Sequence, residues 1–422
     1  MENITRIYHG LPAVLVDDHW VVISSKFDEI ARIAVNQIDD AGTYEELLGR
    51  SFFQSSVRES GSRVSLVTLI TTSDCNLRCS YCFANSGESC RVMSSDIAFA
   101  AVRRALENSS GRKLSVAFFG GEPTLTQGLI RAVVDYATTE SGKIGTEVEF
   151  SITTNGVVNP SFLQFLIERQ FLFTVSVDGP PDIQDYQRPL KSGGPSSAHV
   201  ARTIESLVQG GANFKLRATV TEYSVGKMAE MVAWAGLLGV KEIHFEPLSV
   251  AGRAALVTKG VGLDRPKLQE FIAGLKSAII MGNQSGVGVV NSAFMNLASG
   301  GNSFCDGDSK YRFAITYDGQ VTTCVEVQDR CHPVAAEFMV GGYDPVRGVI
   351  DSTKSRGRAC LVNIRKEESA CVSCFASSVC GGGCPVRNFH TTGDSGKVDP
   401  YRCALVKEML VFAYDLLDKE SE

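Results

Sequence analysis

The sequence predicts an α/β protein built around a partial (β/α)6, TIM-like barrel. First, β-rich segments alternate with longer segments of helical periodicity between about residues 64 and 250, and such alternation implies a parallel sheet with right-handed crossovers. Second, the region holds six strands, which leave a wider side opening than a closed eight-stranded barrel has. Third, polar motifs follow these strands, where active residues gather in such barrels.

We assign this region to one domain, residues 61–260. Its strands are expected near residues 64–71, 113–119, 147–153, 171–177, 213–220 and 240–246. Its helices are expected near residues 94–108, 126–140, 160–169, 197–209 and 226–238.

Length and composition limit the function classes. With 422 residues, 44% hydrophobic and 21% charged, the chain has the composition of an ordinary globular protein of two or three domains, or of one barrel with additions. The net charge of −6 argues against a nucleic-acid partner, which calls for a basic surface. No apolar run approaches the span of a bilayer and no signal pattern opens the chain, so we expect a cytoplasmic protein without a membrane partner.

Residues 1–60 are expected to form a unit of their own. Ala13–Val16 and Trp20–Ile23 predict a β-hairpin across an acidic turn. Thr43 resembles the first residue of a capping box that opens a short helix. An earlier helical pattern is formed by Phe27, Ile30, Ile33 and Ala34. Two interpretations stay open: a packing lid over the barrel, or a small winged-helix-like unit whose strand edge accepts an extended peptide.

The most specific feature is a run of three cysteines, Cys75-Asn-Leu-Arg-Cys79-Ser-Tyr81-Cys82, after the first barrel strand. In a reducing compartment, clustered cysteines indicate metal binding or catalysis rather than disulfides. Iron–sulfur clusters are held by thiolates, and three cysteines leave one of four irons without a protein ligand, where a small molecule can bind. A zinc site would be the competing interpretation, but zinc normally takes four ligands, and the nearest further candidate is Cys90.

The C-x3-C-x2-C spacing, with an aromatic residue before the last cysteine, resembles the signature of the radical S-adenosylmethionine (SAM) superfamily. The resemblance implies a radical SAM barrel in which Cys75, Cys79 and Cys82 hold a [4Fe–4S] cluster. The amino and carboxylate groups of SAM would chelate its open iron. Electron transfer from the cluster would cleave SAM to methionine and a 5′-deoxyadenosyl radical, which abstracts hydrogen from an unactivated C–H bond.

Residues at the ends of later strands extend the resemblance. It places Gly120, Gly121 and Glu122 at the amino group of SAM, which a carboxylate can bind. It implies further SAM contacts for Asn155, Ser176 and Arg217, the last to the SAM carboxylate. Asp178 is expected at the mouth of the substrate cavity. Asn155 and Asp178 each precede a glycine and also fit ordinary turns. Arg217 also fits an exposed arginine on the barrel rim.

Residues 261–422 are expected to contain a linker helix and a second cysteine region. Tyr311–Tyr317 and Gln320–Cys324 predict a hairpin around an Asp-Gly turn, which would bring Cys305 and Cys324 together. The cysteine pattern resembles the SPASM extension of radical SAM enzymes. Its members are Cys305, Cys324, Cys371, Cys374, Cys380, Cys384 and Cys403. Taken alone, the group from Cys371 to Cys384 also fits a four-cysteine zinc site.

The SPASM resemblance implies two auxiliary [4Fe–4S] clusters, and therefore three clusters in the chain. The first auxiliary cluster would use Cys305, Cys324 and Cys384. The second would use Cys371, Cys374, Cys380 and Cys403. Two such clusters need eight ligands, so one is missing from the motif. Cys331 or Cys360 can supply it; otherwise that iron is open, for instance to a substrate thiolate.

The resemblance implies maturation of a ribosomally made precursor peptide, with a thioether or another side-chain crosslink as product. The N-terminal unit supports a peptide partner, and a flavodoxin or ferredoxin would donate the electron. Formylglycine formation in anaerobic sulfatases ranks lower, because the expected aspartate base is replaced by Val325, followed by Glu326. Asp178 and Glu326 are the candidate catalytic carboxylates. A small-molecule dehydrogenase or epimerase also fits the pattern, as does, outside enzymes, a zinc-binding scaffold.

Overall fold

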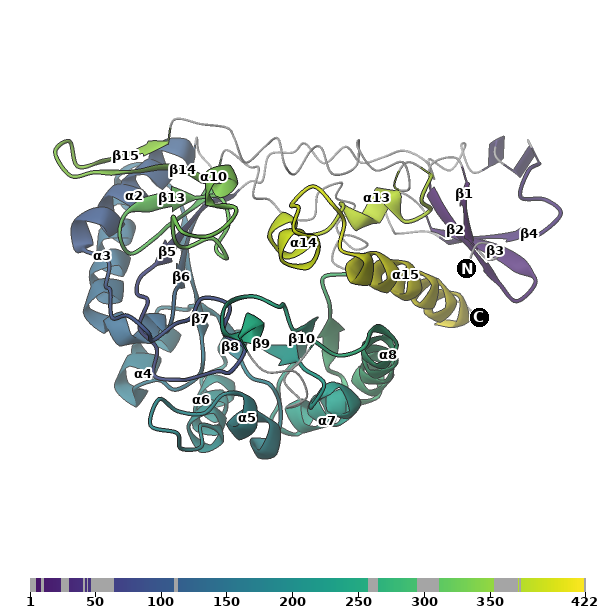
Figure 1. Cartoon of the computed structure of the whole chain (residues 1–422), viewed down its shortest axis with the longest axis horizontal. Coiled ribbons are helices and arrows are strands. Elements are labelled where there is room, and N and C mark those ends of the chain that lie inside the picture. Colours follow the sequence, from purple (N-terminus) through teal and green to yellow (C-terminus); the bar gives the residue numbers. More distant parts are fainter. Residues whose placement is uncertain are drawn as a thin grey trace. The chain divides into compact units, whose positions relative to one another are not determined.

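The computed structural model contains two compact units, and each is considered by itself. The first combines Met1–Gly61, Asn291–Asp306 and Ala359–Glu422, and the second combines Ser62–Val290 and Gly307–Arg358. Figure 1 labels their elements. The structure describes residues 5–8, 11–23, 30–40, 42–43, 45–46, 64–109, 113–256, 265–293, 311–352, 371 and 373–420.

The centre of the second unit confirms the predicted barrel strands. Six strands are parallel and stand side by side in sequence order. They are β5 (Val64–Ile70), β6 (Lys113–Phe119), β7 (Val148–Thr154), β8 (Leu172–Ser176), β9 (Asn213–Val220) and β10 (Glu242–Pro247). Each overlaps the segment expected from the sequence.

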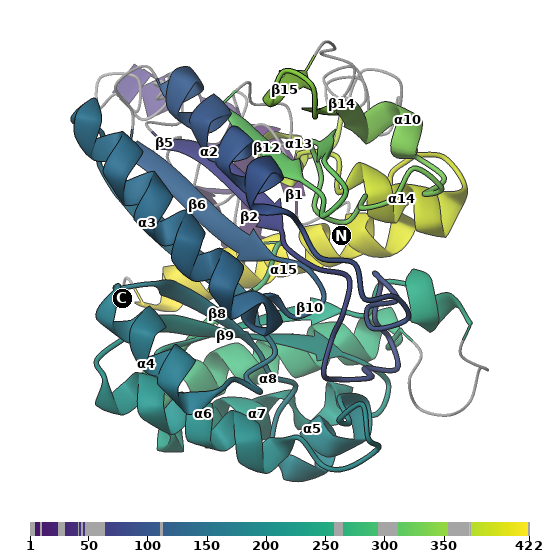
Figure 2. The same ribbon diagram turned by 90° about the vertical axis from the view of Figure 1, so that its left-hand side faces the viewer.

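Helices connect these strands, and Figure 2 shows two of them, α2 and α3, lying along β5 and β6. The helical segments are α2 (Ser95–Ser109), η1 (Pro123–Thr126), α3 (Gln127–Lys143), α4 (Pro160–Glu168), α5 (Pro181–Gln187), α6 (Ser197–Gln209), η2 (Val225–Lys227) and α7 (Met228–Leu237). Local sequence sets their starts: Asn159 accepts hydrogen bonds from the first turn of α4, and Pro160 occupies that turn. The sequence did not predict α5.

Burial along the strands shows which face the helices cover. In β9, Leu216, Ala218 and Val220 are fully buried, whereas Lys215 and Arg217, on either side of Leu216, are exposed. Burial alternates in the same way along β7. The core therefore lies between the sheet and the helices, and the alternate residues of each strand face the inside of the barrel.

The sheet extends beyond the six predicted strands at both edges. The further elements are α8 (Leu268–Ser285), β11 (Gly288–Val290), β12 (Arg312–Ile315), β13 (Gln320–Thr322), α10 (Ala335–Phe338), β14 (Met339–Asp344) and β15 (Val349–Ser352). β11 pairs parallel with β10, and β12 pairs parallel with β5. β12 and β13 form the predicted hairpin, which turns at Gly319 with φ of 84°. The strands β11 to β15 fall within residues 261–422, which were expected to form the C-terminal region, and they continue the barrel sheet.

The N-terminal part of the first unit is a four-stranded antiparallel sheet. Its strands are β1 (Thr5–Tyr8), β2 (Leu11–Val16), β3 (His19–Ile23) and β4 (Ile30–Ala34). β2 and β3 confirm the predicted hairpin, but the helix expected from Ile30 to Ala34 is wrong, because β4 pairs with β3. Ala31 and Ile33 are buried and Arg32 between them is exposed, which is the period of a strand. The described sheet thus contains the predicted hairpin, with a strand in place of the helix that was expected after it. Phe27 lies outside the described residues.

A short helical segment follows this sheet at residues 42–43 and 45–46. The backbone N–H of Thr43 donates to the Asp40 carboxylate at 2.9 Å. Asp40 thus accepts a hydrogen bond at the start of this segment, at the residue that was expected to begin the capping box.

The C-terminal part of the first unit is helical, with α13 (Ser377–Cys380), α14 (Pro385–Thr392) and α15 (Pro400–Glu420). α15 packs on β2 and β3, and the Tyr414 hydroxyl donates to the carbonyl of Pro12 at 3.1 Å. Its buried face is formed by Leu405, Val406, Met409, Leu410, Tyr414 and Asp418. In the described part of the chain, no helix combines the length and hydrophobicity that a membrane span requires.

One carboxylate joins α15 to the sheet by charge. Asp418 is only 4% exposed at its side chain, and its oxygens lie 2.5 Å from Arg32 Nε and 3.1 Å from His19 Nε2. The other ring nitrogen of His19 lies 3.3 Å from Asp18, whose side chain is fully solvated. Burial alone lowers the pKa of His19, but its two carboxylate partners raise it above the ordinary value.

We expect Asp418→Ala to lower the free energy of unfolding of the first unit by about 1–3 kcal/mol, because Arg32 and His19 lose a buried acceptor. Asp18→Ala removes the solvated partner of the same histidine and should have no measurable effect. The pKa of His19 is raised in the folded state. The stabilisation that the His19–Asp418 pair contributes is therefore fully present below pH 6.5 and is lost as the pH rises through the folded-state pKa of His19.

Denaturant titrations that follow Trp20 fluorescence in a Trp234→Phe background report on the first unit, since these are the two tryptophans of the chain. Equal effects of the two aspartate substitutions would contradict the prediction.

Candidate active site

The three cysteines of the first motif lie on the loop that runs from the carboxyl end of β5 to α2. Cys75 is buried, and Cys79 and Cys82 are half-buried. Burial raises the pKa of the Cys75 thiol to about 12 and that of the Cys79 thiol to about 11. Such thiols keep their protons at neutral pH unless a metal displaces them. The chemistry of this loop therefore depends on a bound metal group.

The turn after β6 touches the backbone of the cysteine loop. The N–H of Gly121 donates to the carbonyl of Thr72 at 2.8 Å. A Cβ atom on Gly121 would lie 2.1 Å from the carbonyl oxygen of Asp74, and one on Gly120 would lie 2.6 Å from that of Thr72. Gly120 also has a φ of +141°. The cysteine loop itself thus requires both glycines, which the sequence analysis had related to a ligand.

Glu122 joins this turn to the end of β7. Its carboxylate is fully buried and accepts hydrogen bonds from Thr124 N (3.1 Å), Thr124 Oγ1 (2.7 Å), Thr154 Oγ1 (2.8 Å) and Asn155 N (2.7 Å). Burial raises the pKa of Glu122, and the four donors act in the opposite direction. The resemblance assigns the Glu122 side chain to the SAM ammonium. In the structure, the same carboxylate also fixes the backbone at Thr124 and at Asn155.

Asn155 lies beside the first cysteine. Its amide nitrogen is 2.7 Å from Asn76 Oδ1 and 3.5 Å from the Cys75 sulfur. The N–H of Leu77 also points at that sulfur, at 3.4 Å. Hydrogen bonds to cluster sulfurs are among the features that set the potential of an iron–sulfur cluster. Asn155 is therefore placed to orient Cys75 and to support negative charge on its sulfur.

Ser176 and Arg217 occupy one row across the sheet. Ser176 of β8 is in register with Arg217 of β9, which is in register with His244 of β10. Their side chains belong to the inner face of the barrel, because the residues on either side of Arg217 are buried under the helices. His244 Nε2 lies 3.0 Å from the carboxylate of Glu246 on the same face. The row offers polar groups on three neighbouring strands, at the carboxyl end of β8 and in the middle of β9 and β10.

Asp178, a candidate catalytic carboxylate that we expected at the mouth of the substrate cavity, is fully buried. Its side chain is 0% exposed. Its oxygens accept hydrogen bonds from the hydroxyl of Tyr81, from Gln187 Nε2 (2.6 Å), from Arg188 Nη2 (3.0 Å) and from Thr219 N (2.9 Å). A carboxylate with four donors and no exposure is placed to hold its neighbours rather than to accept a substrate proton.

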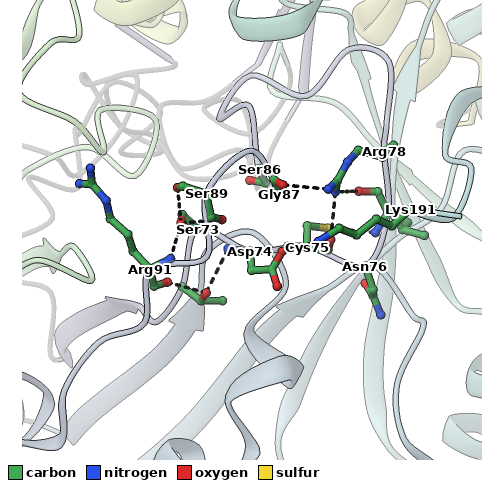
Figure 3. A network of polar contacts seen from close by, with 12 residues as sticks. Ser73, Asp74, Cys75, Asn76, Arg78, Ser86, Gly87, Ser89, Arg91 and Lys191 are labelled. Carbon is green, nitrogen blue, oxygen red and sulfur yellow. Dashed lines mark hydrogen bonds and ion pairs between the residues drawn. The ribbon is translucent and has the colours of Figure 1, made fainter.

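Two arginines that the sequence analysis did not single out hold the cysteine loop. Arg78 donates to the carbonyls of Cys75, Leu77 and Gly87, as Figure 3 shows in part. Arg253 lies on η3 (Gly252–Ala255) and donates to the carbonyl of Cys79 at 2.9 Å. The only sequence signal for them is their position, inside the motif and directly after the last barrel strand.

Figure 3 also shows how the second half of the loop is fixed. Ser73 and Ser89 bond through their hydroxyls at 2.7 Å, and the N–H of Arg91 donates to Ser73 at 3.0 Å. Lys191 lies 3.3 Å from the carboxylate of Asp74. The loop is thus held by side chains along its whole length, although it contains little regular structure.

The donor set fits an iron–sulfur cluster. In such a cluster each thiolate binds a different iron. Three cysteines on one loop, with N–H groups directed at Cys75, would hold three irons of a four-iron cluster and leave the fourth for a small molecule. Among the residues that the structure describes, no three His, Cys, Asp or Glu side chains converge as ligands of one ion.

Comparison with known proteins agrees with this geometry. Residues 69–234 match the radical SAM superfamily. The chain carries a radical SAM domain. The matched segment includes the three cysteines and every residue that the resemblance assigns to SAM, so the protein is an enzyme whose cofactors include SAM and a [4Fe–4S] cluster.

The similarity to individual proteins extends beyond the radical SAM domain. A cysteine-type anaerobic sulfatase-maturating enzyme from Clostridium perfringens is 24% identical over 377 residues, which cover 84% of this chain and 97% of the relative. The structure of anSMEcpe with bound AdoMet aligns with a TM-score of 0.67 and 21% identity, over 84% of this chain and 98% of that one. Streptococcus suis SuiB bound to precursor peptide SuiA aligns with a TM-score of 0.55 and 14% identity, over 91% and 96%. The likeness to these two structures is one of fold.

The later cysteines belong to both units of this radical SAM enzyme. Cys324 follows β13 in the second unit, with Glu326 half-buried close behind it and Cys331 exposed. Cys371, Cys374, Cys380, Cys384 and Cys403 belong to the first unit. Cys305 and Cys360 lie outside the described residues.

A buried amide brings part of the C-terminal group together. Cys380 ends α13, Cys384 immediately precedes α14, and Cys403 lies in the first turn of α15. Asn388 of α14 donates to the carbonyl of Gly382 at 3.2 Å and accepts from the N–H of Asp399 at 3.1 Å. It therefore connects the turn between Cys380 and Cys384 to the start of the helix that carries Cys403.

We expect Gly121→Ala to disorder the cysteine loop, because the new Cβ would lie 2.1 Å from the carbonyl oxygen of Asp74. Iron per chain should fall, and SAM cleavage should fall about 100-fold, as a displacement of about 1 Å commonly causes. Gly128→Ala is the matched control, because it lies on the following helix with nothing within 4 Å of its new Cβ. Iron analysis and 5′-deoxyadenosine formation measure both effects, and wild-type values for Gly121→Ala would refute the prediction.

Proposed function

We propose that this radical SAM enzyme matures a ribosomally made precursor peptide by forming a thioether or another crosslink from a side chain or a Cα position. One observation carries the proposal: a barrel with the SAM-binding cysteine loop shares its chain with a second cysteine group gathered on α13, α14 and α15. The sequence spacing of that group resembles the SPASM extension, and SuiB, a protein of similar fold, has been solved with a precursor peptide.

Three cysteines and the inner face of the barrel would serve the SAM chemistry. When bound, the cluster and SAM supply a 5′-deoxyadenosyl radical. Cys75, Cys79 and Cys82 would hold the cluster, and the Gly120–Glu122 turn and Asn155 would fix the loop and bind the amino group of SAM. Arg217 would pair with the SAM carboxylate, since a guanidinium matches carboxylate geometry. The barrel wall would keep water away from the reacting atoms.

The C-terminal cysteines would hold two auxiliary [4Fe–4S] clusters. Cys305, Cys324 and Cys384 would bind the first, with Cys331, Cys360 or a substrate thiolate at the remaining iron. The second would be bound by Cys371, Cys374, Cys380 and Cys403. The hydrogen bonds of Asn388 support this second set, because they connect the turn after Cys380 to the start of the helix that carries Cys403.

The precursor peptide would dock on the N-terminal sheet, because an extended peptide can add a strand to a sheet edge. β1 and β4 are the outer strands of this sheet. The electron for SAM cleavage would come from a flavodoxin or ferredoxin.

Formylglycine formation in a sulfatase is the second candidate function. The anaerobic sulfatase-maturating enzyme of Clostridium perfringens is matched over 97% of its length. The half-buried carboxylate of Glu326, two residues after Cys324, would then be the base. A peptide crosslink leaves no aldehyde, whereas formylglycine is an aldehyde, so the two products are chemically distinct.

For the cluster assignment we expect Cys75→Ala, Cys79→Ala and Cys82→Ala each to abolish 5′-deoxyadenosine formation. Iron should fall from about twelve to about eight atoms per chain, as expected for loss of one of three four-iron clusters. Cys90→Ala is the control, because Cys90 lies exposed on the same loop. Zinc without sulfide in the wild-type protein would contradict the whole assignment.

For the substrate, we expect the reduced enzyme to remove two hydrogens from a Cys-containing precursor peptide and to leave no group that reacts with a hydrazine. The same assay with a sulfatase-derived Cys or Ser peptide should give no product. Mass spectrometry with and without the hydrazine distinguishes the outcomes, and an aldehyde on the sulfatase peptide would establish the second candidate in place of the first.

A further inference from the structure

Tyr81, between two of the cluster cysteines, is anchored to the barrel by Asp178. Tyr81 is 8% exposed, and its hydroxyl donates to the Asp178 carboxylate, which is fully buried. The two residues are 97 positions apart in the sequence. A buried tyrosine hydroxyl needs a partner, so this bond fixes the middle of the Cys79–Cys82 segment against the end of β8.

Asp178 in turn holds a buried cation. Arg188, directly after α5, lies 3.0 Å from each carboxylate oxygen through Nη2 and Nε. The two side chains are 9% and 0% exposed. Burial alone lowers the pKa of Arg188, but Asp178 raises it well above the ordinary value, so the guanidinium stays charged. Removing one partner of such a pair leaves an uncompensated buried charge.

The cation and a cluster cysteine both lie beside the same small core. Arg188 Cζ is 5.3 Å from the centroid of the Tyr81 ring. Tyr81 forms this core with Leu248 and Ala254, and Cys79 packs against it. The guanidinium and Cys79 therefore belong to one region from which water is largely excluded.

The chain segment around Arg188 is also bonded to the cysteine loop through the backbone. The N–H of Arg78 donates to the carbonyl of Pro189 at 2.8 Å, and the N–H of Ser80 donates to that of Gln187 at 3.3 Å. The distance between Arg188 and the cysteines is thus fixed by two independent sets of bonds, one through side chains and one through the main chain.

We propose that Tyr81, Asp178 and Arg188 form a positioning group in which the buried charges of Asp178 and Arg188 act with opposite, compensating effects on the reduction potential of the cluster held by Cys75, Cys79 and Cys82. A positive charge favours the added electron and a negative charge opposes it, and both act strongly where water is excluded. In the intact pair the two charges largely compensate. The inference requires the radical SAM cluster but not the peptide substrate, so it can fail or hold whichever substrate the enzyme uses.

The decisive experiment changes one charge at a time. Asp178→Asn leaves the Arg188 cation uncompensated and should raise the ratio of reduced to oxidised cluster about tenfold at a fixed potential, an upward shift of about 59 mV for one electron. Arg188→Gln leaves the anion and should shift the potential by a similar amount in the opposite direction. The double variant D178N/R188Q should return close to the wild-type potential. Redox titrations followed by electron paramagnetic resonance, without SAM turnover, measure all three.

Tyr81→Phe separates positioning from charge. It removes the hydroxyl and keeps the pair, so the ratio of reduced to oxidised cluster at a fixed potential should stay within about threefold of the wild-type value. SAM binding should weaken, because the loop loses an anchor. Tyr186→Phe is the matched control, because that tyrosine lies on α5 with 45% of its surface exposed.

Iron per chain and circular dichroism establish that each variant is folded and loaded. If one single-charge variant fails to load, the other still measures the effect of one uncompensated charge, with the sign stated for it above. Unchanged potentials in loaded Asp178→Asn and Arg188→Gln protein, or shifts of the same sign in both, would overturn the proposal. Absence of iron and sulfide from the wild-type protein would instead refute the radical SAM site itself.

Discussion

The close backbone contact between the cysteine loop and the Gly120–Gly121 turn is the constraint on which the rest of the site depends. The loop contains little regular structure, so its backbone groups need partners outside it. The N–H of Gly121 donates to the carbonyl of Thr72, and the N–H of Arg78 donates to that of Pro189. A Cβ on Gly252 would lie 2.4 Å from the carbonyl oxygen of Cys82. The parallel strands bring these turns to one edge of the sheet. The barrel therefore supplies partners for the backbone of the loop along much of its length.

Much of the barrel could be predicted because its signals are local. Strands and helices alternate with clear differences in period, and caps such as Asn159-Pro160 mark the boundaries. Ile30, Ile33 and Ala34 misled the prediction, because an apolar spacing of three and four residues also fits a short strand with Ala31 and Ile33 on one face. The pairing of β12 with β5 could not be predicted, because it joins residues about 250 positions apart and no local pattern encodes that choice.

The site shows the same division between local and distant signals. The cysteine spacing and the Gly-Gly-Glu-Pro turn identified the loop and its neighbour, because each motif is contiguous in sequence. The burial of Asp178 was not predictable from its Asp-Gly dipeptide, since its partners Tyr81, Arg188 and Thr219 come from three other segments. Arg253 was overlooked for the same reason: it acts on the carbonyl of Cys79, 174 positions away. Such roles follow from contacts between segments that are distant in the sequence, and a contiguous motif does not contain them.

Two buried carboxylates give Cys75 and Cys79 different electrostatic surroundings. Glu122 is satisfied by neutral hydroxyl and amide donors, and its charge adds to burial in raising the pKa of Cys75. Asp178 is paired with a cation, and Arg188 opposes the effect of burial on the pKa of Cys79. Negative charge on sulfur is thus opposed by Glu122 at Cys75, where the N–H groups of Asn155 and Leu77 point at the sulfur, and is supported by Arg188 at Cys79. Because Tyr81 connects Asp178 to the loop, the residues that hold the loop in place also create this asymmetry.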